Sequence, residues 1–215
     1  MADWTTISSL ATAGGTLVLA VATFAAVRSA NQSARLAEVA LQEQRRPLLA
    51  QSRLGIDPGQ KIMFVDEHWV RVEGGHGAAE TVDGVIYLVM SLRNVGAGIA
   101  VCQGWVTRMG LMRSNVEHSR EDEFRPQSRD LYIPAGDVGL WQGAIRERND
   151  PARDEVARAI AEQEPITLEL RYSDQVGAQR TITRFTLIPA RDDADGTTRF
   201  ISSGRNWYLD RAGPR

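Results

Sequence analysis

The sequence predicts a mainly β protein in which an N-terminal transmembrane helix and a helical stalk precede an antiparallel β-sandwich with one short helix. Three observations lead to this prediction. Residues 4–27 contain no charged side chain, helix-forming residues then continue without Gly or Pro to residue 46, and beyond Pro47 the hydrophobic period changes from helical to two. The predicted parts are an N-terminal tail and transmembrane helix at 1–27, a stalk at 28–47, a sandwich domain at 48–209 and a flexible tail at 210–215.

The run WTTISSLATAGGTLVLAVATFAAV at 4–27 has the length and polarity of a membrane-spanning helix. A helix needs about 20 mainly apolar residues to cross the hydrocarbon core, at ~1.5 Å of rise per residue. Serine and threonine hydroxyls are tolerated there because they bond back to helix carbonyls. The side chains predicted to span the membrane or anchor the helix in it are Trp4, Ile7, Leu10, Leu17, Leu19, Phe24, Val27 and Arg28.

Three other interpretations of this run are weaker. A buried core helix needs a large protein around it, whereas the remaining chain is short and is predicted mostly as strands. A cleaved signal peptide needs a basic region before a shorter apolar segment. Asp3 is the only charged side chain before Ser8, although the small residues from Ala20 to Ala26 resemble a cleavage site. A helix lying flat in the interface needs a charged face, which the run lacks.

Basic residues lie on one side of the apolar run only. Arg28, Arg35, Arg45 and Arg46 follow it, and no Lys or Arg precedes it. Basic flanks stay in the cytoplasm, so we expect the N-terminus outside and the C-terminal domain in the cytosol, with the chain in the inner (plasma) membrane and in contact with its lipid. The single cysteine, Cys102, excludes an intrachain disulfide and fits a reducing compartment.

Small residues recur along the same helix, largely at four-residue spacing, which lets two helix backbones approach closely. They are Ala11, Gly15, Ala22, Ala26 and Ala30. A homo-oligomer formed through the transmembrane helix and stalk is therefore one hypothesis. The alternative is that alanine is simply common in this sequence.

Alternating hydrophobicity predicts the strands of the domain. The clearest are 85–94 and 166–172, and 180–188 is the expected hairpin partner of the second. Residues 150–164 are predicted as a helix capped by Asp150 with Pro151 at its first position, and 115–130 and 191–198 as exposed loops. The other predicted strands are 48–54, 61–65, 68–73, 99–109, 138–145, 199–201 and 206–209.

Aromatic residues within these strand patterns are candidates for the core. Trp69, Trp105 and Trp141 are expected to be buried or half-buried. Trp207 and Tyr208, near the end of the chain, either close the edge of the sandwich or form an exposed contact for a protein partner.

Two segments resemble a known kind of domain. LRNVGAGIA at 92–100 resembles the strand, Asn-x-Gly turn and following strand of bacterial immunoglobulin-like sandwich domains, and YSDQVGAQRTITRFTL at 172–187 resembles their late hairpin. The layout of apolar anchor, stalk, Arg-Pro and sandwich is similar to uncharacterised single-pass bacterial membrane proteins. The resemblance implies an immunoglobulin-like β-sandwich and a membrane location, and it brings no catalytic residues.

Motifs for catalysis, metals or cofactors are not evident. His68, His76 and His118 are not at metal-ligand spacing and are expected at the surface. DDADG at 192–196 lacks carboxylates at the first and last positions of a calcium loop, so a solvated turn is favoured over a nonstandard calcium site. The glycines at 96 and 98 lack the third glycine and the helix of a dinucleotide fingerprint. We expect no catalytic residue, no metal and no cofactor.

These features favour a membrane-anchored, non-enzymatic interaction or scaffold module that presents its domain to a protein partner. The alternative is a membrane-tethered sensor of a small ligand or divalent ion. A hydrolase assembled from distant residues is disfavoured because no activated nucleophile is visible. The net charge of −2 gives no field that would attract nucleic acid.

Overall fold

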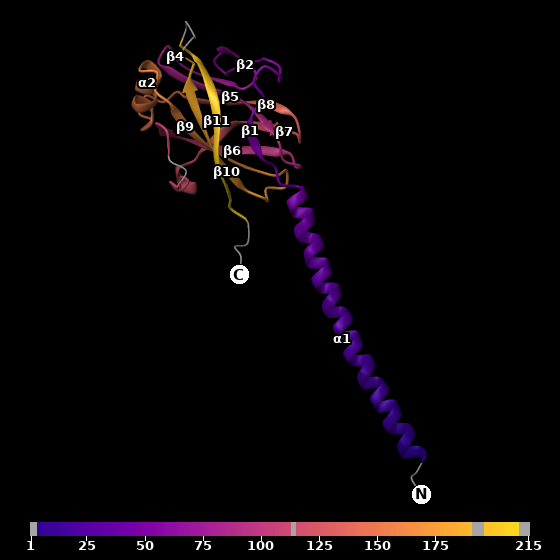
Figure 1. Ribbon diagram of the computed structural model, residues 1–215. Helices are drawn as coiled ribbons and strands as arrows, with labels where there is room; N and C mark the ends of the chain where they lie inside the picture. The colour runs from indigo at the N-terminus through magenta and orange to yellow at the C-terminus, as the bar shows by residue number, and fades with distance from the viewer. Residues whose placement is uncertain (1–3, 113–114, 191–195, 211–215) are drawn as a thin grey trace. The chain divides into compact units, whose positions relative to one another are not determined.

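The computed structural model describes residues 4–112, 115–190 and 196–210, without the side chains of 4–7, 9–11 and 42–43. The chain divides into two compact units, one that holds helix α1 and one that begins at Arg45. The second unit is a mainly β domain (Figure 1).

Helix α1 spans Trp4–Gln44, so the segments predicted as transmembrane helix and stalk form one continuous helix. The hydroxyl of Thr12 donates to the carbonyl of Ser8 at 2.9 Å, and that of Thr16 donates to the carbonyl of Thr12 at 2.8 Å. These polar groups are therefore satisfied inside the helix. The helix ends before Pro47 because a residue preceding proline disfavours helical backbone.

The elements of the domain are labelled in Figure 1. In chain order they are β1 (Leu49–Gln51), β2 (Gln60–Met63), β3 (Trp69–Val72), β4 (His76–Val82), β5 (Val85–Asn94), β6 (Ala100–Met109), the 3₁₀ turn η1 (Glu121–Glu123), β7 (Arg125–Ile133), β8 (Val138–Ile145), α2 (Arg153–Ala161), β9 (Ile166–Ser173), β10 (Thr181–Pro189) and β11 (Thr198–Tyr208).

Within the described residues, nine strands form one antiparallel sheet that curls into a half-barrel. The strand order is β1-β5-β4-β11-β10-β9-β6-β7, and β8 pairs with β5. Gln127 on β7 joins the two ends of the curl: its amide donates to the Gln142 carbonyl on β8 at 2.8 Å, and its oxygen accepts from Trp141 Nε1 at 3.0 Å. The expected pair of packed sheets is not confirmed, because one curled sheet encloses the core by itself.

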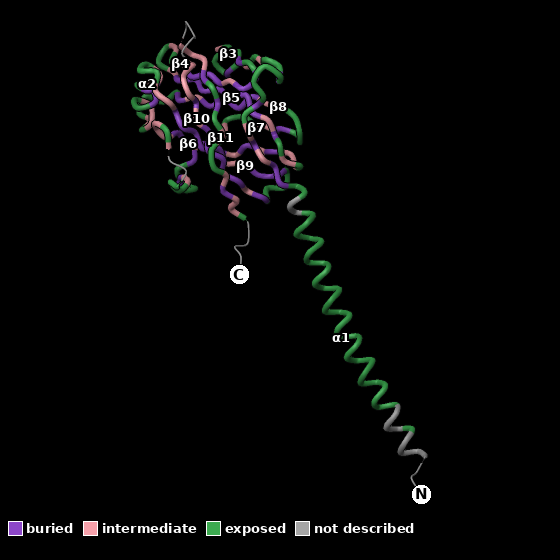
Figure 2. Tube along the Cα trace, viewed as in Figure 1, coloured by how far each residue is buried: buried purple, intermediate pink, exposed green. Residues whose placement is uncertain are grey.

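The core lies inside the curl, as the purple strands in Figure 2 show. Leu88 of β5, Leu170 of β9 and Phe185 of β10 are fully buried there. Trp105 and Trp141 are also buried, as expected, and their rings meet edge to face with centroids 5.4 Å apart. Helix α2 adds buried apolar residues to the same cluster.

Asn94, in the predicted Asn-x-Gly turn, joins three parts of the domain. Its Oδ1 accepts from the backbone N–H of Leu48 at 3.1 Å and of Gly96 at 3.0 Å, and its Nδ2 donates to the carbonyls of Gly98 at 2.6 Å and Ile133 at 2.9 Å. The side chain is fully buried and uses all four of its bonding sites. It therefore holds the start of β1, the β5–β6 turn and the end of β7 together.

Two strands were not expected from the sequence. β4 is rich in Ala and Gly, which have low β propensity, and it is held by β5 and in part by β11. β7 falls largely within 115–130, a segment expected to be a loop. The expectation was wrong because β7 lies at the edge of the sheet, where a strand can carry polar side chains. Segments 199–201 and 206–209 prove to be one strand, β11, which extends to Tyr208.

Helix α2 begins at Arg153, so the expected start at Pro151 is wrong by two residues. Asp150 still acts in the preceding turn, where its carboxylate accepts the N–H of Ala152 at 2.9 Å. The same carboxylate forms an ion pair with Arg125 at 2.7 Å.

Candidate membrane anchor and interaction surface

The described apolar side chains of α1 are not covered by protein. Leu17 and Leu19 are 68% exposed and Phe24 is 70% exposed. Figure 2 shows the described part of α1 in green, the colour of exposed residues. The segment Thr12–Leu41 is long and apolar enough to cross a membrane, and none of it is buried. Val27 and Arg28 are exposed on the same helix. The side chains of Trp4, Ile7, Leu10 and Ala11 lie outside the described residues.

The small residues of α1 leave one side of the helix open. Gly15, Ala22, Ala26 and Ala30 are exposed, and a Cβ built at Gly15 would meet no atom within 4 Å. This geometry permits a second helix to approach. Self-association of α1 stays a prediction.

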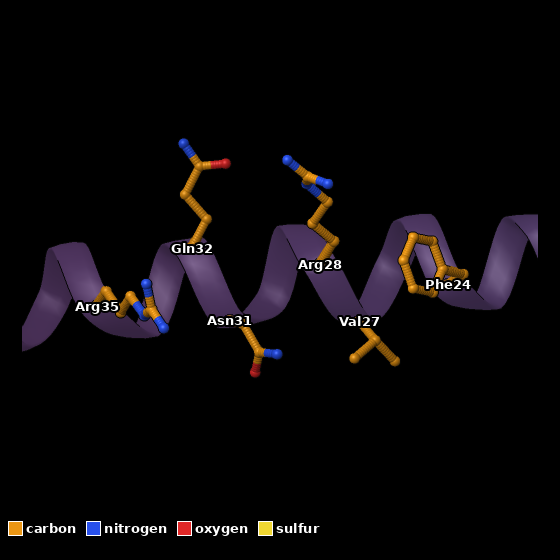
Figure 3. A pocket seen from close by; sticks show the side chains of 6 residues that line it. All are labelled: Phe24, Val27, Arg28, Asn31, Gln32 and Arg35. Atoms are coloured by element: carbon orange, nitrogen blue, oxygen red, sulfur yellow. The ribbon is translucent and has the colours of Figure 1, made fainter.

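Polar residues follow the apolar run along α1. Figure 3 shows that Arg28 and Gln32 point to one side, that Asn31 points to the other, and that Arg35 and Phe24 lie between them. None of the four polar side chains forms a hydrogen bond or ion pair with a residue that the structure describes. Their donors are therefore available to a group outside the chain.

The β2–β3 hairpin has one buried and one exposed face. Phe64, Val70 and Val72 pack over Tyr87 and Val89 of the large sheet. Because strand side chains alternate, the neighbouring residues point away from the domain.

The outer face of this hairpin carries Lys61, Met63, Trp69 and Arg71, all of them exposed. Lys61 Nζ lies 4.5 Å from the centre of the Trp69 ring, a cation–π contact. The expectation that Trp69 belongs to the core is wrong, since 52% of it is exposed. The inward positions are filled by β-branched valines, so the tryptophan takes the outer face.

A polar cluster fixes the hairpin to the sheet. The Tyr87 hydroxyl donates to Asp66 Oδ2 at 2.7 Å, and Arg146 lies 3.3 Å from the same oxygen. His68 Nε2 lies 2.7 Å from Glu80 Oε1, and its ring stacks on Tyr87 with centroids 4.3 Å apart. Burial and the bond to Asp66 raise the pKa of Tyr87 to about 12. The hairpin is therefore docked by both packing and charge.

Burial by itself would raise the pKa of Asp66, but the net shift is downward. The hydrogen bond from Tyr87 and the charge of Arg146 stabilise the carboxylate and outweigh the burial. Asp66 is therefore ionised at neutral pH, which supports the docking of the hairpin.

Trp207 is buried, with only 9% of its surface exposed, and it packs with Val106, Phe124 and Ile182. Trp207 therefore packs against the domain and does not form an exposed contact. Tyr208 is half-buried, and the Arg46 guanidinium lies 4.7 Å from its ring centre.

An ion pair in the sheet was not apparent from the sequence. Strand β9 was expected to be half-buried, yet Glu169 is fully buried and Arg184 of β10 is 4% exposed. Arg184 Nη2 lies 2.5 Å from Glu169 Oε1, and Ser119 N–H donates to Glu169 Oε2 at 2.7 Å. Arg184 also donates to the carbonyl of Glu117 at 2.8 Å. The pair holds the segment before η1 against the outer face of the sheet.

Metal-binding groups are not assembled in the described part of the chain, where no three His, Cys, Asp or Glu side chains gather. His68, His76 and His118 are half-buried instead of lying freely at the surface. The acidic residues 192–195 lie outside the described residues. Cys102 is buried, as expected, and burial raises the pKa of its thiol to about 12.

Comparison with protein-family models, with curated proteins and with solved structures finds no match to this chain.

Proposed function

We propose that this chain is a single-pass protein of the inner membrane that presents its β domain to a protein partner in the cytosol and performs no catalysis. The observation that carries the proposal is the uncovered apolar surface of α1, where Leu17, Leu19 and Phe24 are each at least two-thirds exposed. Burying such surface in lipid is favourable by ~25 cal/mol per Å².

The arginines support the proposed orientation. Arg28 and Arg35 follow the apolar run directly, and basic flanks are retained in the cytoplasm. We propose that the curled sheet is related to the immunoglobulin-like β-sandwich domains of single-pass bacterial membrane proteins.

The outer face of the β2–β3 hairpin is the proposed partner surface. Tryptophan is enriched where protein interfaces bind most strongly, and Trp69 stands exposed with Met63 opposite it in the paired strands. Lys61 over the ring adds a positive charge. A partner with an apolar side chain flanked by carboxylates fits this chemistry.

Topology and capture test the proposal separately. Fused to the C-terminus, a reporter active only after export should be inactive, and a cytosolic reporter should be active; the reverse pattern contradicts the orientation. For the partner surface, crosslinked complexes are purified from native membranes. We expect W69A to lose a stoichiometric partner that the wild type retains. V176A is the control and should also retain it, because Val176 is 67% exposed but lies in a different turn. Equal recovery from all three contradicts the role of Trp69.

A second candidate function is a tethered sensor, favoured by a polar hollow of about 530 Å³. Charged side chains line it, among them Glu123, Arg125, Arg146 and Asp150. A ligand that binds only the folded domain must raise its melting temperature. Thermal melts across divalent cations and small anions test this, and a flat response removes the sensor.

A further inference from the structure

Residues 28–35 of α1, RSANQSAR, divide by size between two helix faces. At about 100° per residue, Arg28, Asn31, Gln32 and Arg35 fall within roughly one-third of the circumference. The small residues Ser29, Ala30, Ser33 and Ala34 take the remainder. In Figure 3, Arg28 and Gln32 point to one edge of this face and Asn31 to the other, and Arg35 and Phe24 lie between them.

We propose that this face, called here the arginine face and made of Arg28, Asn31, Gln32 and Arg35, binds the headgroup of an anionic phospholipid. The inference rests on the proposed function, because it needs the preceding run to lie in the membrane. A phosphodiester accepts hydrogen bonds from guanidinium and amide N–H groups, and the acyl chain of the same lipid lies along the apolar side chains of Phe24 and Val27.

The depth of the arginine face agrees with this ligand. Arg28 and Arg35 are separated by roughly 10 Å along the helix axis, at ~1.5 Å per residue. The polar layer of one leaflet is roughly 5–8 Å thick, and arginine side chains extend along the helix to reach it. Arg28 thus reaches the phosphate, and Arg35 reaches the outer part of the headgroup.

The charge of the arginine face is not neutralised by any residue that the structure describes. Neither Arg28 nor Arg35 has an ion-pair partner among the residues that the structure describes. Between residues 4 and 35 the sequence contains no Asp or Glu. Two exposed cations on one face, next to an uncharged span, favour a headgroup with net negative charge over a zwitterionic one, whose own cation opposes them.

A face-swapping variant separates a shaped site from attraction by net charge. R28A/A30R keeps the composition and moves one guanidinium by roughly 200° around the helix. R148Q, at an exposed arginine of the domain, is the control for loss of one charge. Full-length protein in neutral detergent is titrated with phosphatidylglycerol or phosphatidylcholine, and native mass spectrometry counts the lipids bound per chain.

We expect the wild type and R148Q to prefer phosphatidylglycerol by more than tenfold. R35Q should lose about fivefold, which corresponds to ~1 kcal/mol for one basic residue near an anionic surface. R28A/A30R should lose as much, because its moved guanidinium no longer reaches the same headgroup. Binding by R28A/A30R at wild-type strength, or no preference in the wild type, overturns the inference. Carbonate extraction of native membranes is done in parallel. A chain that is extracted refutes the proposed membrane anchor itself, whereas a chain that resists extraction without lipid preference refutes only the arginine face.

Discussion

The ion pair between Glu169 and Arg184 provides a quantitative test of how the domain is held together. In R184M the Glu169 carboxylate stays buried but loses the Arg184 Nε and Nη2 donors, which lie 2.9 and 2.5 Å from its Oε1. Of the donors to this carboxylate among the described residues, the Ser119 N–H, at 2.7 Å, remains. Removing one partner of a buried pair costs about 3–5 kcal/mol. We expect R184M to lower the free energy of unfolding by about that amount.

The assay is urea denaturation of the full chain in mild detergent at pH 7, followed by tryptophan fluorescence because Trp105 and Trp141 lie in the core. The double variant E169L/R184M removes both charges, and we expect it to recover most of the loss, since a buried pair replaced by apolar residues is often neutral. R148M, at an exposed arginine, should change stability by less than about 0.5 kcal/mol. A loss below about 1 kcal/mol in R184M would show that water or another cation reaches Glu169, which would refute the reasoning.

Three further outcomes follow from the same structure. N94A should lower the free energy of unfolding by about 2–4 kcal/mol in the same assay, because it leaves buried backbone groups unpaired; a change under about 1 kcal/mol contradicts the bonding described. W141A should cost about 3–5 kcal/mol as a core truncation, whereas W69A should cost less than about 0.5 kcal/mol as a surface change; equal losses contradict the assigned exposures. Cys102 should resist thiol reagents in the folded domain at pH 8, and rapid labelling without unfolding contradicts its burial. The pKa of its thiol is raised from 9.0 to about 12 by folding. The free energy of unfolding should therefore be unaffected below pH 9 and fall as the pH rises from there towards 12, because only the unfolded chain ionises in that range.

Local composition determined the helix and several strands. Residues 4–44 form one helix because nothing before Pro47 interrupts a run of helix-forming residues. β5, β8 and β9 form at or close to the bounds that the apolar patterns predicted, although both faces of β5 and β9 are buried. Cys102, Trp105 and Trp141 are buried as their apolar surroundings predicted.

Only the tertiary structure decided which strands pair and which faces are covered. One curled sheet formed in place of the expected pair because β4 pairs with β11 and β9 pairs with β6, so that the strands follow one another in a single continuous order. Trp69 is exposed and Glu169 buried because exposure depends on what packs against a strand face, and a shift of one residue exchanges the two faces. Such contacts join residues far apart in the chain, so the local sequence pattern carries no record of them.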